Sequence, residues 1–212
     1  GVSLSGTFTR PVDCRDAAVI FSHTFFSDRH VSGMFDSLGR ALCRAGYATL
    51  AFDHSGHGAS GDEIITFDPL IEDFRSASGW LADQGFARQI CIGHELRSRP
   101  PAVQTYVLVS PVLGPLSYDW NLVFSDVQLS DLEHHGATTV PDDSASVRQQ
   151  FTISKRTLAD MSMVPGAHHA RLLRRRNRPA RSHTRSFPSA ARRLPRRDDC
   201  LTRRYRRRIH AG

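Results

Sequence analysis

Short apolar segments alternate with amphipathic ones along the first half of this chain, and this alternation restricts the fold more than any other feature. Residues 17–23 (AAVIFSH) and 47–53 (YATLAFD) are rich in apolar, β-branched and aromatic side chains. Strands of this kind are buried on both faces, as in a parallel sheet that helices cover. Between them, apolar residues recur at helical spacing over 34–45, and Gly46 follows as a residue that ends helices. The pattern predicts an α/β fold with a parallel sheet.

The alternation continues to residue 110 but is interrupted once. An Asp-Pro pair begins a predicted helix over 68–85, and strands are predicted over 89–92 and 106–110. Two neighbouring parallel strands need a crossover of a dozen or more residues, which is usually helical. The segment 96–105 has only ten residues, and two of them are proline. We therefore expect the crossover helix to be missing at this place.

Charge is distributed unevenly between the body of the chain and its C-terminal end. Residues 1–165 hold 12 Lys and Arg against 19 Asp and Glu, whereas residues 166–212 hold 16 Arg against two Asp. Apolar side chains in 166–212 are isolated among arginines and cannot offset the entropy of ordering, so a disordered basic tail is predicted. Such a tail would bind anions weakly and without sequence preference. Its composition is also what a GC-rich message yields when it is translated out of frame.

The spacing of cysteine and histidine predicts neither a metal site nor a cofactor. Four cysteines lie far apart, without a C-x-x-C pair, which indicates reduced thiols and a cytoplasmic protein. His54 and His57 lie three residues apart in a glycine-rich loop, but no third ligand is near them in the sequence, and we interpret them as structural. No run of eighteen apolar residues is present, so no membrane partner is predicted.

Residues 90–98 (ICIGHELRS) have the form of a turn that carries a hydrolase nucleophile, but the nucleophile is replaced. In the pattern G-x-S-x-G, a strand runs into a sharp turn with a serine at its apex, and a helix follows at once. Gly93 is present, whereas Glu95 replaces the serine and Arg97 replaces the second glycine. A carboxylate can itself act as a nucleophile, but Arg97 would pair with Glu95 and weaken it. The other interpretation is an inert residue.

Five segments together carry a resemblance to a known superfamily: AVIFSHTFFSDRH, GYATLAFDHSGHGASG, ITFDPLIEDFRSASGWLADQGF, ICIGHELRS and YVLVSPVLGPLSYD. They resemble the α/β-hydrolases, in the serine esterase and serine aminopeptidase-like branch. The resemblance implies an α/β-hydrolase core whose parallel sheet is incomplete at its C-terminal side. It divides the chain into an N-terminal core (1–115), a lid-like insertion (116–165) with a helix expected over 147–163, and the disordered tail (166–212).

The same resemblance implies roles for individual residues. The backbone N–H groups of Phe25 and Leu96 match the two donors of an oxyanion hole. Glu95 occupies the nucleophile position. The tract 164–169 resembles the one around the catalytic histidine, which places His169 at the position of the base, although no strand that ends in the catalytic Asp precedes it.

By resemblance, the reaction is hydrolysis of a small ester or amide substrate by a serine mechanism. Because Glu95 replaces the serine and the acid is not recognisable, we expect this chain to have little or no such activity. Two alternatives stay open. The chain could be a non-catalytic binding or interaction protein on a hydrolase scaffold, or the product of a frameshifted pseudogene.

Overall fold

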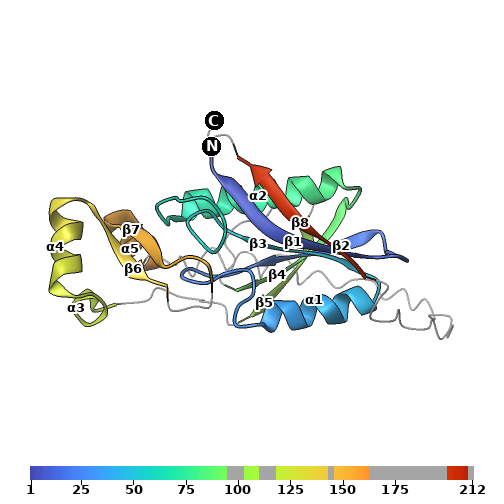
Figure 1. Ribbon diagram of the computed structural model, residues 1–212, viewed down its shortest axis with the longest axis horizontal. Helices are drawn as coiled ribbons and strands as arrows, with labels where there is room; N and C mark the ends of the chain where they lie inside the picture. Colours follow the sequence, from blue (N-terminus) through green and yellow to red (C-terminus); the bar gives the residue numbers. More distant parts are fainter. Residues whose placement is uncertain (95–102, 110–117, 143–145, 163–199, 210–212) are drawn as a thin grey trace, which may run out of the picture.

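The centre of the computed structural model is a six-stranded sheet with the strand order β5-β4-β2-β3-β1-β8 (Figure 1). The structure describes residues 1–94, 103–109, 118–142, 146–162 and 200–209. β2, β3, β4 and β5 are parallel, whereas β1 is antiparallel to β3 and β8 is antiparallel to β1. This sheet confirms the predicted α/β class. Its strands are Ser3–Pro11 (β1), Ala17–Ser22 (β2), Ala48–Asp53 (β3), Arg88–His94 (β4), Val103–Val109 (β5) and Cys200–Arg208 (β8).

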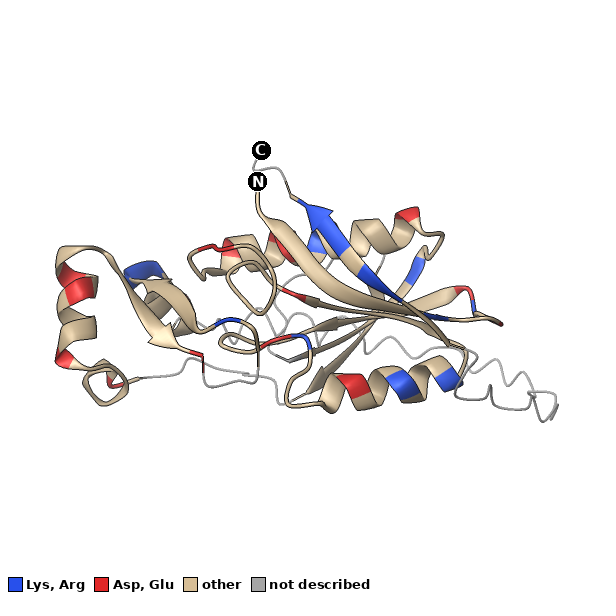
Figure 2. Cartoon of the chain, in the orientation of Figure 1, with Lys and Arg blue, Asp and Glu red and all other residues tan. Residues whose placement is uncertain are grey.

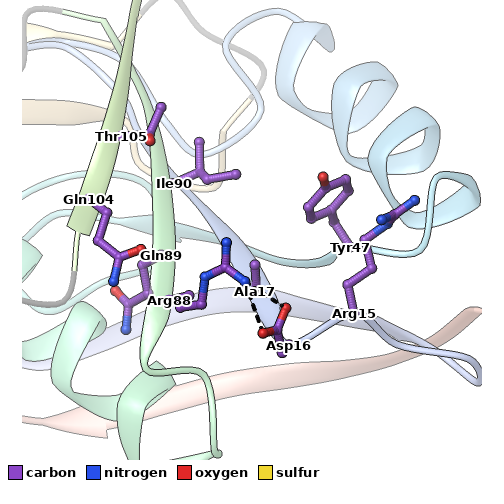
Figure 3. A pocket seen from close by; sticks show the side chains of 9 residues that line it. All are labelled: Arg15, Asp16, Ala17, Tyr47, Arg88, Gln89, Ile90, Gln104 and Thr105. Atoms are coloured by element: carbon purple, nitrogen blue, oxygen red, sulfur yellow. Dashed lines mark hydrogen bonds and ion pairs between the residues drawn. The ribbon is translucent and has the colours of Figure 1, made fainter. Parts of the chain in front are cut away.

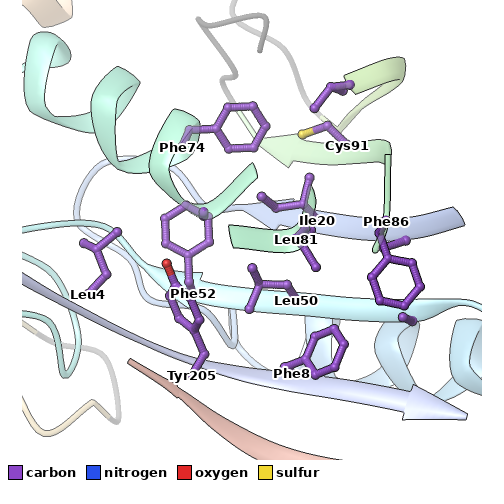
Figure 4. Close-up of a cluster of buried hydrophobic side chains, with 14 residues drawn as sticks. Leu4, Phe8, Ile20, Leu50, Phe52, Phe74, Leu81, Phe86, Cys91 and Tyr205 are labelled. Atoms are coloured by element: carbon purple, nitrogen blue, oxygen red, sulfur yellow. The ribbon is translucent and has the colours of Figure 1, made fainter. Parts of the chain in front are cut away.

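Helices α1 (Met34–Arg44) and α2 (Phe67–Asp83) cover opposite faces of the sheet (Figure 1). All six residues of β2 are buried, and their side chains alternate between the faces. Ile20 belongs to the larger core cluster with Phe74 of α2 (Figure 4), whereas Phe21 packs on the other face against α1. Burial on both faces is what the uniformly apolar sequence of this strand predicted.

β1 is a strand that the sequence analysis did not find. Leu4, Gly6 and Phe8 are buried, and they alternate with partly exposed polar residues. This period of two is the signal of a half-buried strand. A Cβ at Gly6 would lie 2.6 Å from the carbonyl oxygen of Ala51, so the close approach of β1 to β3 requires glycine.

β4 and β5 lie side by side as parallel strands, as the order of the predicted elements requires. β5 begins at Val103, three residues earlier than predicted, and the expected loss of the crossover helix concerns residues 95–102, which lie outside the described ones. Within the described part of the chain, β5 forms one edge of the sheet, and this agrees with the expected incompleteness on that side.

Residues 118–142 and 146–162 form a small second unit beside the sheet (Figure 1). Its β6 and β7 pair as an antiparallel sheet. The helix expected over 147–163 is wrong in its first half, because residues 150–154 pair with β6 and the helix begins only at Lys155. The elements are α3 (Trp120–Val123), α4 (Asp126–His134), β6 (Ala137–Pro141), β7 (Gln150–Ser154) and α5 (Lys155–Ser162).

This unit is attached to the segment that leads into α2. The backbone N–H of Ile65 donates to the carbonyl oxygen of Thr152 (3.0 Å), and that of Phe67 donates to Asp160 Oδ2 (2.9 Å). Phe151 is buried in a third apolar cluster with Ile65 and Phe25. The unit therefore packs beside the loop that follows β2, while the three domain boundaries stay predictions.

The expectation of disorder over the whole of 166–212 is wrong for residues 200–208. These residues form β8, which pairs with β1 along its full length. Tyr205 is 1% exposed and packs edge-on against Trp80, with ring centroids 4.9 Å apart. Arg203 stacks over Phe8 and over the same Trp80. The apolar partners of β8 come from parts of the chain more than a hundred residues away, so no local pattern could reveal them.

The expectation that all cysteines are reduced is wrong for one pair. A disulfide joins Cys43 in α1 to Cys200 at the start of β8, whereas Cys14 and Cys91 are free thiols. The two bonded residues lie 157 positions apart, so their spacing gave no signal. No described helix is long and apolar enough to cross a membrane. The cytoplasmic location stays a prediction.

Candidate functional site

The candidate site lies at the carboxyl edge of the parallel strands, where β2, β3 and β4 end together. Ser22, the last residue of β2, is opposite Gly93 in β4. The next residue along β4, His94, is the last of that strand. Ligand sites in open parallel sheets form at this edge because the loops that follow the strands converge there. Of these loops, the structure describes residues 23–33 after β2 and 54–61 after β3.

Only one of the four predicted site residues lies in the described part of the chain. Phe25 is 9% exposed, and its ring packs against Phe67 with centroids 4.8 Å apart. Its loop follows β2 at the predicted edge, as an oxyanion-hole loop must. Glu95, Leu96 and His169 lie outside the described residues, so their predicted roles stay predictions.

Three histidines at this edge are buried, and two of them are fixed as neutral rings. The backbone N–H of His54 donates to His23 Nε2 (3.0 Å), so His23 carries its proton on Nδ1, which donates to the carbonyl oxygen of Thr24 (2.8 Å). Similarly, His57 Nε2 accepts from the N–H of Phe26 (3.3 Å), and its Nδ1 donates to the carbonyl oxygen of Ser55 (2.8 Å).

Burial opposes a charge on both of these rings. Burial, together with the neighbouring His54 and His57, lowers the pKa of His23 well below its usual value. Burial likewise lowers the pKa of His57 to about 3, although its hydrogen bond to Ser55 acts in the opposite direction. Both nitrogens of each ring already have backbone partners, so neither ring is free to bind a metal or to accept a substrate proton. The structural interpretation of His57 agrees with this geometry.

Ser22, His54 and Asp73 form a buried constellation that the sequence analysis missed. Ser22 Oγ lies 3.1 Å from His54 Nε2, and His54 Nδ1 lies 3.5 Å from Asp73 Oδ2. The same carboxylate oxygen accepts the backbone N–H and the hydroxyl of Ser55 at 2.7 and 2.8 Å. Three different elements supply these residues, so no motif in the sequence signals them. Ser22 is only 4% exposed, so in this conformation its hydroxyl cannot attack a substrate.

Asp53 joins the two described loops to each other. It is fully buried, and its carboxylate accepts the backbone N–H groups of Arg29 (2.8 Å) and Ala59 (2.9 Å). It also pairs with the guanidinium of Arg29. Gly58 has φ 45°, and a Cβ there would lie 2.4 Å from Asp53 Cγ, so this turn requires glycine. Asp53 is therefore a positioning residue.

A separate pocket of about 290 Å³ lies at the amino ends of the parallel strands, opposite the candidate site (Figure 3). Arg88 and Asp16 form an ion pair at 2.9 Å beside it. Ala17 and Gln89 are at the amino ends of β2 and β4, so this pocket is separate from the loops described above. In the part of the chain that the structure covers, no group of three or more His, Cys, Asp or Glu residues could hold a metal ion.

Solved hydrolases share this arrangement of strands and helices. A monoacylglycerol lipase from Paleococcus ferrophilus matches with a TM-score of 0.53 and 18% identity, over 78% of this chain and 70% of the lipase. DcsB, solved in complex with its substrate analogue, matches with a TM-score of 0.58 and 14% identity, over 78% of this chain and 71% of its own. GrgF from Penicillium sp. sh18, an α/β-hydrolase, matches with a TM-score of 0.52 and 16% identity, over 82% of this chain and 63% of GrgF. This chain has the α/β-hydrolase fold.

These likenesses establish the fold and leave the branch of the α/β-hydrolases open. No protein-family model matches the chain, and no curated protein matches it. The matched part spans 63–71% of the three solved chains, so about a third of each hydrolase lies outside the match. The serine esterase and serine aminopeptidase-like branch therefore stays a prediction.

Proposed function

We propose that this α/β-hydrolase-fold chain binds small ester or amide substrates at the carboxyl edge of β2 and β4 but hydrolyses them little or not at all. The observation that carries the proposal is the residue after β4. The strand ends at His94, beside the loop that holds Phe25, and the residue that follows is Glu95 rather than serine. The proposal places the chain in the serine esterase and serine aminopeptidase-like branch.

Two of the described histidines, His23 and His57, support the expected loss of activity. A serine mechanism needs a histidine that can take up and return a proton. His23 and His57 each use both ring nitrogens in hydrogen bonds to the backbone, and their lowered pKa values keep them neutral. Neither can replace a missing base. Removal of one member of a triad typically reduces turnover by a factor of about 10⁴ or more.

The retained loop structure favours binding without turnover over complete loss of the site. Asp53 holds the loops after β2 and β3 together, and Asp73 fixes the loop after β3 to α2. Backbone groups therefore stay in defined positions although the nucleophile is replaced. The second candidate function is a non-catalytic interaction protein on a hydrolase scaffold, which would keep the same loop structure without a small ester or amide substrate.

Hydrolysis of short p-nitrophenyl esters tests the proposal. We expect the wild-type chain and Glu95→Ala to release p-nitrophenol at the rate of the buffer blank. Glu95→Ser restores the residue type of the family, and any gain above the blank would indicate that the remaining groups still assemble. Turnover by the wild type that Glu95→Ala abolishes would overturn the proposal, because Glu95 would then be a working nucleophile.

A further inference from the structure

The side chains of β8 alternate between two faces of the sheet, and those on one face make contacts with the rest of the protein. Arg203, Tyr205 and Arg207 are on the side of α2. Arg203 stacks over Trp80 at 5.2 Å, and Arg207 pairs with Asp83 at 3.6 Å. This face of the strand is therefore part of the fold.

The other face of β8 presents a row of positive charge. Arg204, Arg206 and Arg208 are exposed, and no ion pair involves any of them within the described residues. Figure 2 shows the positive charge along this strand. We call these three residues the arginine row.

Hydroxyl groups accompany the arginine row on the neighbouring strand. In the antiparallel register, Arg204 is opposite Thr7, Arg206 is opposite Ser5 and Arg208 is opposite Ser3. Directly opposed residues of an antiparallel pair point to the same face. Guanidinium and hydroxyl groups are the side chains that proteins use most to contact phosphate oxygens.

We propose that the arginine row, with its neighbouring hydroxyls, binds single-stranded nucleic acid through consecutive phosphates. Alternate residues of a strand are about 6.6 Å apart, so the row offers cations at regular intervals along a straight line. An extended phosphodiester chain offers anions in the same manner. The row contains no aromatic side chain on which bases could stack, so binding is independent of sequence and depends strongly on salt.

The positive surface continues beyond the end of the row. A pocket of about 340 Å³ begins at Thr7 and Thr202 and extends to Arg40 and Arg44 of α1. Since it opens on the same face as the row, a bound strand that follows β8 can continue over α1. An acidic peptide strand that paired with β8 would instead place side chains on both faces of the sheet. On the α2 face, however, Arg203 already stacks over Trp80 and Arg207 already pairs with Asp83.

Two double variants of equal charge test the proposal in the full chain. Binding of a fluorescein-labelled oligothymidylate is measured by anisotropy over a series of salt concentrations. For Arg204→Gln with Arg206→Gln, we expect about tenfold weaker binding at low salt. The slope of log K against log salt should fall in magnitude by about 1.4, which is about 0.7 for each lost phosphate contact of a single strand.

The control variant carries Arg75→Gln with Arg88→Gln, two exposed arginines elsewhere on the surface. It removes the same charge, and the arginines of residues 166–199 stay in both variants as a common background. We expect the control to bind as the wild type does. Equal losses in the two variants would show an effect of net charge alone and overturn the proposal. Loss of binding to vesicles that contain phosphatidylserine, without loss of oligothymidylate binding, would identify a lipid surface instead.

Discussion

The centre of the sheet and its β8 edge use the same residue types in opposite environments. At the centre, Asp53 is fully buried and pairs with Arg29, which is 21% exposed. At the edge, Arg207 pairs with Asp83, and these side chains are 33% and 71% exposed. Removing one partner of a buried pair leaves an uncompensated charge in a poorly solvated place, whereas water replaces an exposed partner. Burial rather than the pairing itself decides how much each ion pair contributes to the free energy of unfolding.

The largest effect is expected from Asp53→Ala. It leaves the Arg29 guanidinium and the backbone N–H groups of Arg29 and Ala59 without their acceptor, and we expect a loss of about 3–5 kcal/mol in the free energy of unfolding. Urea denaturation followed by circular dichroism measures it. The matched control is Asp83→Ala at the edge, for which we expect less than about 1 kcal/mol. Equal losses in the two variants would contradict the comparison.

A smaller effect is expected from Tyr205→Ala, which tests whether β8 depends on a single buried side chain. Tyr205 fills the space between β8 and Trp80, and its removal should cost about 3 kcal/mol. Trypsin should then cleave within 203–208 faster than in the wild type. Leu201→Ala is the control, since Leu201 is 69% exposed and its loss should change little. Rapid cleavage of the wild type at these arginines would show that β8 is not formed.

The smallest of the three effects is a pH dependence of the free energy of unfolding, which arises at the centre of the sheet. The pKa of His57 is about 3 in the folded chain and about 6.5 when unfolded, so the unfolded state binds more protons between these values. The stabilisation from the neutral ring is complete above about pH 6.5 and declines as the pH falls toward 3. Between pH 7 and pH 5, His57 should contribute a loss of about 2 kcal/mol.

Urea denaturation of the wild type and of His57→Gln at both pH values isolates this contribution. The variant should lose about 2 kcal/mol less than the wild type on acidification. A wild type and a variant with identical pH dependence would refute a depressed pKa of His57.

The parallel centre could be predicted from sequence because its cause is local. β2 and β3 are mostly apolar over consecutive residues, and α1 carries its apolar residues at helical spacing before Gly46. Each of these segments identifies its own structure without reference to the others.

The candidate site could be predicted only in outline. The resemblance assigned Phe25 to an oxyanion hole; the structure shows Phe25 buried in the loop after β2, and its role stays a prediction. Sequence reasoning did not find the Ser22–His54–Asp73 constellation, because a strand, a loop and a helix supply the three residues. It interpreted His54 and His57 as structural without finding their buried neighbour His23.

From the sequence alone, the α/β sheet could be predicted because its pattern lies in neighbouring residues, and a local pattern of the same kind predicts Glu95 at the position where the fold usually has a serine. Residues 200–208 look like an unpatterned basic segment in the sequence, and their strand forms only through tertiary contacts. Phe8 and Trp80 cover Arg203 and Tyr205, and Cys43 bonds Cys200. These contacts join residues far apart in the chain. The free energy that orders β8 therefore arises from partners that its own sequence does not contain.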